Sequence, residues 1–406
     1  MKEKWSELKK YPLLILFFVF LFGFMMLDGM WPKRPSSELE RRDLAQYPKF
    51  SWKALFANEW TAAYDEYTKD QVVFRDTWIR MQSRSESLLA QKVEIGGALI
   101  GKNEQLFTKM FALKPQEEKL MAKNTKLVAD FTAAYPGTVT LLLAPSASLI
   151  YEEDLPAQAP MLDEASYLDD IFSAVGAENS LDLRQAFTAA KGQKRYYNTD
   201  HHWTTEGGAY VAYQEYCARK GLTPGVVPAG QLSAVEDFYG TTYAKCVLWN
   251  QTPDTLYYWD IPNQMTIWAI DNYGNPVPQT TDTKGNTIDA VTSGLYENEK
   301  FKTADKYSAL LYGNQGYTTV EGTGTGKLLV IKDSYANSLV PYLTQNYTQI
   351  GVVDPRSYKF NLNTLMETEG YDEVLLVFNF QTFVSNNSLN GLVLPIAEDA
   401  KSAPAT

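Results

Sequence analysis

Short apolar runs recur along the chain and alternate with segments of helical periodicity. Each run holds four to six residues and is followed by polar or turn-forming residues. The runs are residues 138–143, 327–331, 350–353 and 373–378, with a shorter candidate at 181–183. This alternation predicts an α/β fold with a parallel sheet flanked by helices. Because open α/β sheets bind ligands beyond the carboxyl ends of their strands, we expect the loops after these runs to surround one site.

Other stretches predict further elements. Residues 60–92 have helical periodicity, and residues 98–107 form two apolar runs around a turn, which predicts a hairpin. Residues 206–220 predict a helix with one apolar face, ended by Gly221. From about 224 to 322 the sequence becomes dense in Thr, Gly, Asn, Asp and Tyr. That composition predicts short antiparallel strands inserted into the α/β domain.

The N-terminus carries a membrane-targeting pattern. Four lysines within the first ten residues precede an apolar run, 11–27, and Trp31 follows at the expected outer interface. Seventeen residues is the lower limit for crossing a bilayer, so a signal peptide is the alternative. No small-x-small cleavage site follows the run. We therefore expect an uncleaved anchor, with the lysines inside and the chain from residue 32 outside.

Length and charge narrow the class of partner. A chain of 406 residues is too long to fold around one small hydrophobic core. Its length predicts a large α/β domain with an insertion, or two modules. Its net charge is −11, and the first ten residues carry +2, which leaves −11 − 2 = −13 for the remainder. An exterior this acidic argues against nucleic acid as a partner and against tight adsorption to anionic polymers.

Aromatic residues and cysteines add two weaker indications. The 26 Tyr and 9 Trp suit a sugar-binding surface, although Tyr-rich cores use the same residues.

The two cysteines, Cys217 and Cys246, both lie in the part of the chain expected outside the membrane. They can form one disulfide, or Cys217 can be buried on the apolar face of its helix.

Both histidines of the chain lie side by side, at His201 and His202. A general base that titrates near neutral pH without a large pKa shift must be one of them. In an extended segment, side chains at i and i+2 point to the same side, so we expect Asp200 to reach His202 while His201 points away. A carboxylate beside an imidazole orients it and stabilises its charged form, as the base of a nucleophile requires. The alternative is a structural histidine at a helix start.

Ser334 is the candidate nucleophile. The segment 327–339 predicts a strand, a sharp turn and a helix, with Ser334 in the first helical turn. Free backbone N–H groups and the helix dipole at that position can stabilise an oxyanion. The alternative is a plain serine N-cap.

We expect neither a metal nor another cofactor. Catalytic zinc needs about three protein ligands, and adjacent His201 and His202 cannot easily bind one ion together. The sequence has no further histidine and no CxxC or Cys/His zinc pattern.

With these motifs in view, the chain resembles the DHHW protein family, anchored extracytoplasmic proteins of Gram-positive bacteria. That family is related to the SGNH hydrolase-like domains of the alginate O-acetyltransferases. The resemblance covers most of residues 36–385. Its specific blocks are Asp200-His201-His202-Trp203 and Lys332-Asp333-Ser334.

The resemblance implies an SGNH hydrolase-like fold and a triad of Ser334, His202 and Asp200. The usual Gly-Asp-Ser block of such enzymes is Lys332-Asp333-Ser334 here, and the oxyanion blocks cannot be placed. For contacts to the oxyanion or substrate, the candidates are Gly313, Asn314, Asn379 and Arg356.

The function expected is acyl transfer at the cell surface, with O-acetylation of an extracellular polysaccharide through an ester on Ser334. The resemblance implies a membrane O-acyltransferase partner that delivers the acetyl group. A carbohydrate acetylesterase would use the same residues with water as the acceptor. The second class is a non-catalytic polysaccharide-binding or assembly protein, which would tolerate loss of the Ser334 hydroxyl.

The expected organisation has five parts. They are a cytoplasmic stub at 1–10, a transmembrane anchor at 11–31, a helical segment with a hairpin at 32–107, an α/β domain at 108–390 containing the insertion, and a tail at 391–406.

Overall fold

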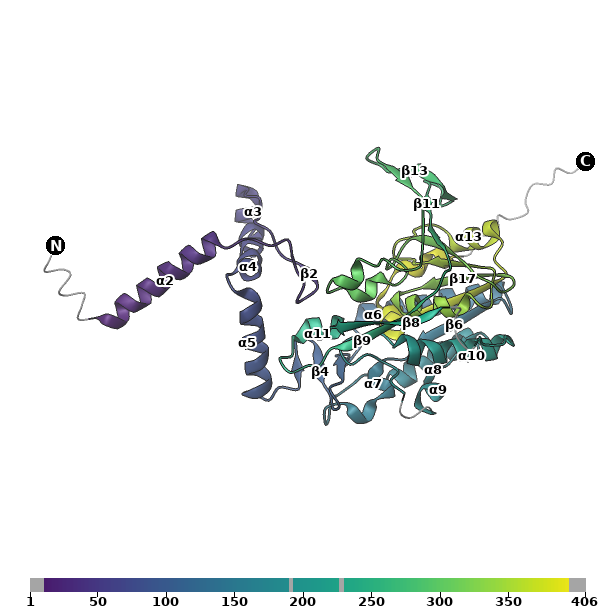
Figure 1. Cartoon of the computed structure of the whole chain (residues 1–406), viewed down its shortest axis with the longest axis horizontal. Coiled ribbons are helices and arrows are strands. Elements are labelled where there is room, and N and C mark those ends of the chain that lie inside the picture. Colours follow the sequence, from purple (N-terminus) through teal and green to yellow (C-terminus); the bar gives the residue numbers. More distant parts are fainter. Residues whose placement is uncertain (1–10, 190–192, 226–229, 394–406) are drawn as a thin grey trace, which may run out of the picture. The chain divides into compact units, whose positions relative to one another are not determined.

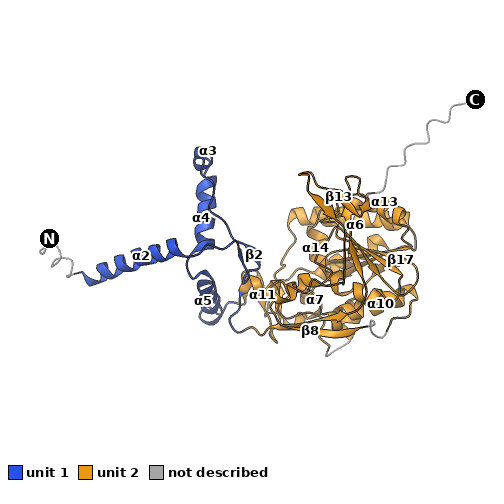
Figure 2. Cartoon of the chain, turned by 45° about the horizontal axis from the view of Figure 1, so that its top comes forward, with its two compact units in different colours: residues 1–92, 247–250 blue, residues 93–246, 251–406 orange. Residues whose placement is uncertain are grey.

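In the computed structural model, residues 11–189, 193–225 and 230–393 are described. The chain divides into two compact units, one of residues 1–92 with 247–250 and the other of residues 93–246 with 251–406 (Figure 2). The predicted cytoplasmic stub and the predicted tail from residue 394 onward lie outside the described residues.

The first unit begins with an apolar helix, α2 (Pro12–Met30). Its 19 residues have a mean hydropathy of 2.4 and none is buried, so by length and composition it can cross a membrane. These features fit a membrane anchor, and a signal sequence shares them.

Helices α3 (Trp52–Phe56), α4 (Glu59–Gln71) and α5 (Arg75–Leu88) follow, after a two-stranded pair of β1 (Ser36–Ser37) and β2 (Arg42–Asp43). The predicted helical segment 60–92 therefore contains two helices. Phe74 has a left-handed backbone with φ of 59°, which ends one helix and starts the next.

The second unit is built on one eight-stranded sheet in the order β15-β10-β16-β18-β17-β19-β6-β7. Five of these strands run parallel and confirm the predicted runs. They are β6 (Val139–Ala144), β7 (Ser180–Leu181), β17 (Lys327–Lys332), β18 (Gln349–Val353) and β19 (Glu373–Asn379). Figure 1 labels two of them, β6 and β17.

Residues of β17 alternate between two cores, one on each face of the sheet. Leu328 and Val330 belong to one core with helices α10 (Tyr210–Lys220) and α12 (Val340–Leu343). Leu329 and Ile331 belong to the other, with the helices on the opposite face. Those helices are α6 (Pro115–Ala134), α8 (Glu164–Val175), α13 (Leu362–Glu369) and α14 (Phe380–Ser385). A strand buried on both faces reads as a continuous apolar run, which is why the sequence pattern located these strands.

The predicted β-rich insertion does not stand apart from the sheet. Three of its strands extend the sheet by antiparallel pairing from β18, so the sheet is mixed. These strands are β16 (Tyr317–Glu321), β10 (Met265–Ile267) and β15 (Val291–Ser293). The others form two-stranded ribbons: β8 (Gln231–Phe238) with β9 (Asp254–Asp260), β11 (Ala269–Ile270) with β12 (Pro276–Val277), and β13 (Gln279–Thr281) with β14 (Thr287–Asp289).

Smaller elements complete the unit. The predicted hairpin at 98–107 is confirmed as part of a three-stranded sheet of β3 (Glu94–Ile95), β4 (Ala98–Ile100) and β5 (Leu106–Thr108). The short helices are α7 (Ala147–Ile150), α9 (Arg184–Ala189), α11 (Thr241–Cys246), η1 (Glu152–Asp154), η2 (Thr205–Ala209), η3 (Lys300–Lys302), η4 (Lys306–Ala309), η5 (Ser334–Ser338) and η6 (Ser388–Leu392). The predicted helix at 206–220 is confirmed as a π-helical turn, η2, that continues into α10 and ends at Gly221.

The two cysteines do not form a disulfide. Cys217 and Cys246 are both buried thiols, and Cys217 lies in the apolar core against α12. Burial raises the pKa of the Cys217 thiol to about 11, so it is protonated and unreactive at neutral pH.

Gly351 lies in the middle of β18, where a Cβ would overlap the hydroxyl and ring of Tyr371. The Tyr371 side chain is buried and its hydroxyl bonds Tyr317, so the ring has little room to move. We therefore expect Gly351→Ala to lower the free energy of unfolding by about 1–3 kcal/mol in urea titrations. Gly294→Ala, where a Cβ meets nothing within 4 Å, is the control and should change it by less than about 0.5 kcal/mol. Equal effects at both positions would contradict the packing argument.

Candidate active site

Ser334 begins the short helix η5 directly after β17 and Asp333. Its side chain is partly exposed, whereas residues 328–333 and 335–343 are all buried. Asp333 accepts a hydrogen bond from Tyr335 N at 2.9 Å and fixes the turn. Ser334 N has no hydrogen-bond partner among the described residues, so this N–H remains available beside the hydroxyl.

Asp200, His202 and Ser334 form one line of hydrogen bonds. His202 Nδ1 lies 2.5 Å from Asp200 Oδ1, and His202 Nε2 lies 2.7 Å from Ser334 Oγ. Because the carboxylate can only accept, the network assigns the imidazole proton to Nδ1 and leaves Nε2 to accept from the serine hydroxyl. Asp200 and His202 are 1% and 5% exposed. The structure thus brings together the three residues predicted as a triad.

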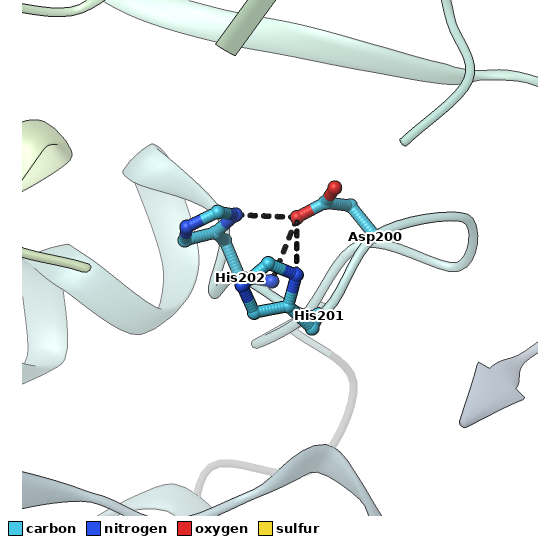
Figure 3. A group of neighbouring side chains, drawn as sticks. All are labelled: Asp200, His201 and His202. Carbon is cyan, nitrogen blue, oxygen red and sulfur yellow. Dashed lines mark hydrogen bonds and ion pairs between the residues drawn. The ribbon is translucent and has the colours of Figure 1, made fainter. Parts of the chain in front are cut away.

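The predicted reason for the Asp200–His202 pair was wrong. Residues 198–202 form a bend rather than an extended segment, and His202 N donates to Asp200 Oδ1 at 2.9 Å. His201 therefore does not point away. Its ring lies 3.9 Å from the ring of His202, and both imidazoles face the same carboxylate (Figure 3).

The second oxygen of Asp200 is held by the start of α11. Thr241 donates to Asp200 Oδ2 from its backbone N at 2.6 Å and from its hydroxyl at 2.9 Å. A Cβ on Gly240 would overlap the Asp200 side chain, so only glycine allows this approach. Sequence reasoning assigned no role to either residue.

Tyr307 is a second residue that sequence reasoning missed. Its ring stacks on the imidazole of His202 with centroids 3.8 Å apart and an interplanar angle of 13°. Its hydroxyl donates to the carbonyl oxygen of Ser334 at 3.1 Å. Tyr307 comes from η4, about 100 residues along the chain from His202, so no local pattern could indicate the contact.

Trp203 joins the histidine loop to the helix of Ser334. Its indole N–H donates to Tyr335 O and to Ser338 Oγ, each at 2.9 Å. The side chain is fully buried in the core. A buried indole N–H needs an acceptor, so these bonds fix the distance between His202 and Ser334.

The four candidates for oxyanion or substrate contacts have other partners. Lys332 Nζ donates to Gly313 O at 3.2 Å and to Asn314 Oδ1 at 2.8 Å. Asn379 Nδ2 donates to Asp333 Oδ2 and to Thr382 Oγ1, each at 2.9 Å. Arg356 forms an ion pair with Asp354 at 2.5 Å.

Lys332, at the place of the glycine in the expected Gly-Asp-Ser block, is buried beside this network. Burial lowers the pKa of its amine to about 8. Its Nζ also donates to Asn337 Oδ1 at 2.6 Å, so the amine links the 313–314 loop to the helix that starts at Ser334.

Asp200, His201 and His202 are also a geometric candidate for a metal site, because their ligand atoms lie within 4.8 Å of one another. The hydrogen bonds describe them better. Tetrahedral zinc with Zn–N bonds of about 2.0–2.1 Å separates its ligands by about 3.3 Å, whereas His202 Nδ1 and Asp200 Oδ1 are 2.5 Å apart. His201 Nδ1, the third ligand atom, is 2.6 Å from the hydroxyl of Thr241.

Two family models match parts of this chain. The DHHW protein model matches residues 181–353, which contain Asp200, His202 and Ser334. A second model, the SGNH hydrolase-like domain of the acetyltransferase AlgX, matches residues 98–230. The resemblance to the DHHW family is confirmed. A comparison with curated proteins found no match.

Solved structures share the fold. A DHHW family protein from Eubacterium siraeum superposes with a TM-score of 0.57 at 19% identity, covering 74% of this chain and 96% of its own. PatB1 from Bacillus cereus, in a structure with a sulfonyl adduct, gives a TM-score of 0.53 at 17% identity and covers 72% and 97%. A second PatB1 structure gives 0.52 at 18% identity, with coverage of 71% and 97%. At these identities the similarity establishes the SGNH hydrolase-like fold.

A largely apolar pocket lies beside the triad. It is lined by His201, Tyr335 and Asn379, and Asn379 Nδ2 donates to Asp333, the residue before Ser334. Its apolar wall is formed by Leu106, Phe107, Met110, Met161, Leu162 and Phe380. Glu164 and Ser146 also line the pocket, and Glu164 accepts hydrogen bonds from Ser146 N at 2.8 Å and Ser146 Oγ at 2.5 Å. Burial raises the pKa of Glu164 to about 7.

Removing Tyr307 should slow the reaction of Ser334 with a small activated acetyl ester. We expect Tyr307→Leu, which loses both the stack and the hydroxyl, to lower the acylation rate on the order of 10–10²-fold, since a mispositioned base loses part of its 10²–10⁴-fold contribution. Tyr307→Phe keeps the ring stacked on His202, so its acylation rate should fall by a smaller factor. Acylation is followed by intact mass, with melting temperature recorded for each variant. Unchanged rates in both folded variants would show that Tyr307 does not position the base.

Glu164 should make stability fall as pH rises. Its folded-state pKa of about 7 lies above its ordinary value of 4.5, so the folded protein retains a proton that the unfolded chain releases. The contribution of Glu164 to the free energy of unfolding is complete below pH 4.5 and is lost as the pH rises through 7. Between pH 4.5 and 8, wild type should lose on the order of 3 kcal/mol relative to Glu164→Gln in urea unfolding. If wild type instead became more stable than Glu164→Gln as the pH rises, the raised pKa of Glu164 would be contradicted.

Proposed function

We propose that the protein is a cell-surface acyltransferase that O-acetylates an extracellular polysaccharide through an ester on Ser334. The observation that carries the proposal is the unbroken line Asp200–His202–Ser334, with the serine partly exposed at the start of a helix. The match to an SGNH hydrolase-like acetyltransferase domain supports acyl transfer as the general reaction.

In the first step, Ser334 Oγ attacks the carbonyl carbon of an acetyl donor while His202 Nε2 takes the serine proton. Negative charge develops on the carbonyl oxygen, and Ser334 N is placed to donate to it. Collapse of the tetrahedral intermediate breaks the bond to the donor's leaving group, which takes the proton from His202. Acetyl-Ser334 remains.

In the second step, a sugar hydroxyl attacks the acetyl carbon of the ester. His202 Nε2 removes the hydroxyl proton and returns a proton to Ser334 Oγ as the serine leaves. Asp200 stays ionised throughout and stabilises the imidazolium, held in place by the two hydrogen bonds from Thr241.

The apolar helix α2 supports an extracytoplasmic role for the rest of the chain. In the proposal, α2 is an uncleaved anchor, the chain from about residue 32 lies outside the membrane, and the α/β domain of residues 108–390 carries the site. The acetyl donor is delivered by a membrane O-acyltransferase. The pocket beside His201 and Tyr335 is the proposed place for donor or acceptor, because its apolar wall excludes water that would hydrolyse the ester.

The test uses the full chain in detergent with p-nitrophenyl acetate. Wild type should form an acetyl adduct on Ser334 detectable by intact mass and peptide mapping. Ser334→Ala should form none, and His202→Ala should lower the acylation rate on the order of 10²–10⁴-fold. Ser293→Ala, in the strand β15, is the matched control and should behave as wild type.

A sulfonyl fluoride gives an independent readout, since PatB1 has been solved with a sulfonyl adduct and sulfonyl fluorides react with activated serines. Modification of Ser334 in wild type and not in His202→Ala would support the proposed roles. If folded wild type takes neither label, the proposal fails and the non-catalytic polysaccharide-binding role becomes the better account.

Transfer and hydrolysis are separated by adding acceptor. A panel of surface polysaccharide fragments, incubated with wild type and the acetyl ester, should gain acetyl groups faster than free acetate accumulates. Acetate formation that no acceptor reduces would identify an esterase, which uses the same residues with water.

A further inference from the structure

Seven aromatic rings in the first unit form one continuous surface, called here the aromatic surface. It lies on α3, α4 and the segment before them, and neighbouring ring centroids are 5.0 to 6.2 Å apart. Its members are Tyr47, Phe50, Trp52, Phe56, Trp60, Tyr64 and Tyr67. Figure 2 draws these helices in blue.

Much of this surface is open to solvent. Phe56 is 85% exposed, Trp52 67% and Tyr47 63%. A contiguous group of exposed rings is costly in water and marks a surface that binds something apolar. These aromatic residues take no part in the acyl transfer proposed for Ser334, His202 and Asp200.

Contacts tie the aromatic surface to the end of α2. Asp28, in the last turn of α2, accepts a hydrogen bond at 2.7 Å from the backbone N of Val73, the second residue after α4. Lys33 Nζ donates to Gln71 O at 3.1 Å and lies 5.9 Å from the centroid of the Tyr67 ring. Since α4 has 13 residues at about 1.5 Å each, its rings lie within about 20 Å of the point where α2 ends.

The distribution of charge also favours a lipid surface. Exposed Lys49 and Lys53 lie among the aromatic residues in the sequence, after Tyr47 and after Trp52. On α4, Trp60, Tyr64 and Tyr67 share one face at the i, i+4, i+7 spacing. Asp65 and Glu66 lie on the other side of the helix, where Lys69 pairs with both at 2.6 and 3.6 Å.

We propose that the aromatic surface inserts into the lipid headgroup region of the membrane that α2 crosses. Trp, Tyr and Phe occupy the boundary between headgroups and acyl chains, and Lys49 and Lys53 contact lipid phosphates. The proposal goes beyond the proposed function and depends on it only in keeping α2 in the membrane. It gives the protein a second attachment, which holds the first unit at the membrane surface.

The experiment places a polarity-sensitive fluorophore at Phe56→Cys in the full chain, reconstituted into phosphatidylglycerol–phosphatidylcholine vesicles. The native cysteines are 0% and 2% exposed and do not compete for the label. Tyr273→Cys is the matched control, because Tyr273 is 86% exposed and lies in the second unit. Lipids brominated near the headgroup should quench the label at residue 56 about twofold more than at 273, and iodide should show the reverse.

A charge variant tests the lysines. Lys49→Glu with Lys53→Glu should lower the lipid quenching at residue 56 in vesicles with phosphatidylglycerol, since the added carboxylates repel the anionic headgroups. Flotation of the vesicles checks that α2 has incorporated, and acylation by p-nitrophenyl acetate reports the Ser334 site separately.

Several outcomes would overturn the proposal. They are failure of the full chain to float with vesicles, iodide quenching that is equal at residues 56 and 273, and protection at residue 56 that disappears when protein is diluted in excess lipid. The last result would identify a second copy of the chain as the occupant. An inactive Ser334 with lipid quenching intact would reject the proposed function and leave this inference standing.

Discussion

The site depends on one constraint: a buried carboxylate, Asp200, must keep its charge satisfied while it orients His202. Both of its oxygens are engaged, one by the histidine side chain and backbone and the other by Thr241. Removing a charged group from water is costly unless hydrogen bonds replace the water, so the loop at 198–202 and the start of α11 must meet. Gly240 permits that meeting because it has no side chain.

A second set of contacts fixes the imidazole relative to the serine. Trp203 bonds the helix that starts at Ser334, while Tyr307 stacks on His202 and holds the Ser334 carbonyl. The carboxyl ends of β17 and β19 add Asp333 and Asn379, which bond each other because the two strands are parallel neighbours. Four segments distant in sequence thus converge at one edge of the sheet, as expected for the site of an open α/β sheet.

The expected orientation of His201 was wrong, and the candidates for oxyanion or substrate contacts have partners that the sequence did not show. We expected His201 and His202 to point to opposite sides because side chains alternate along an extended strand. Residues 198–202 form a bend instead, so this alternation does not apply to them. The candidates Gly313 and Asn314 accept hydrogen bonds from the buried amine of Lys332, and Gly313 N donates to Leu310 O at 3.0 Å. Arg356 is paired with Asp354. Residue type and approximate position in the sequence indicate which polar groups could contact a substrate. Only the full set of contacts shows which of these groups already have a hydrogen-bond partner within the protein.

The sequence by itself determined the five parallel strands, because strands buried on both faces must be continuously apolar. It also determined the membrane-compatible helix α2 and, through two unusual blocks, the candidates Asp200, His202 and Ser334. The tertiary structure alone decided that the inserted strands extend the sheet and that Thr241, Gly240 and Tyr307 complete the site. These contacts join residues 40 to more than 100 positions apart, and no local periodicity encodes such distances.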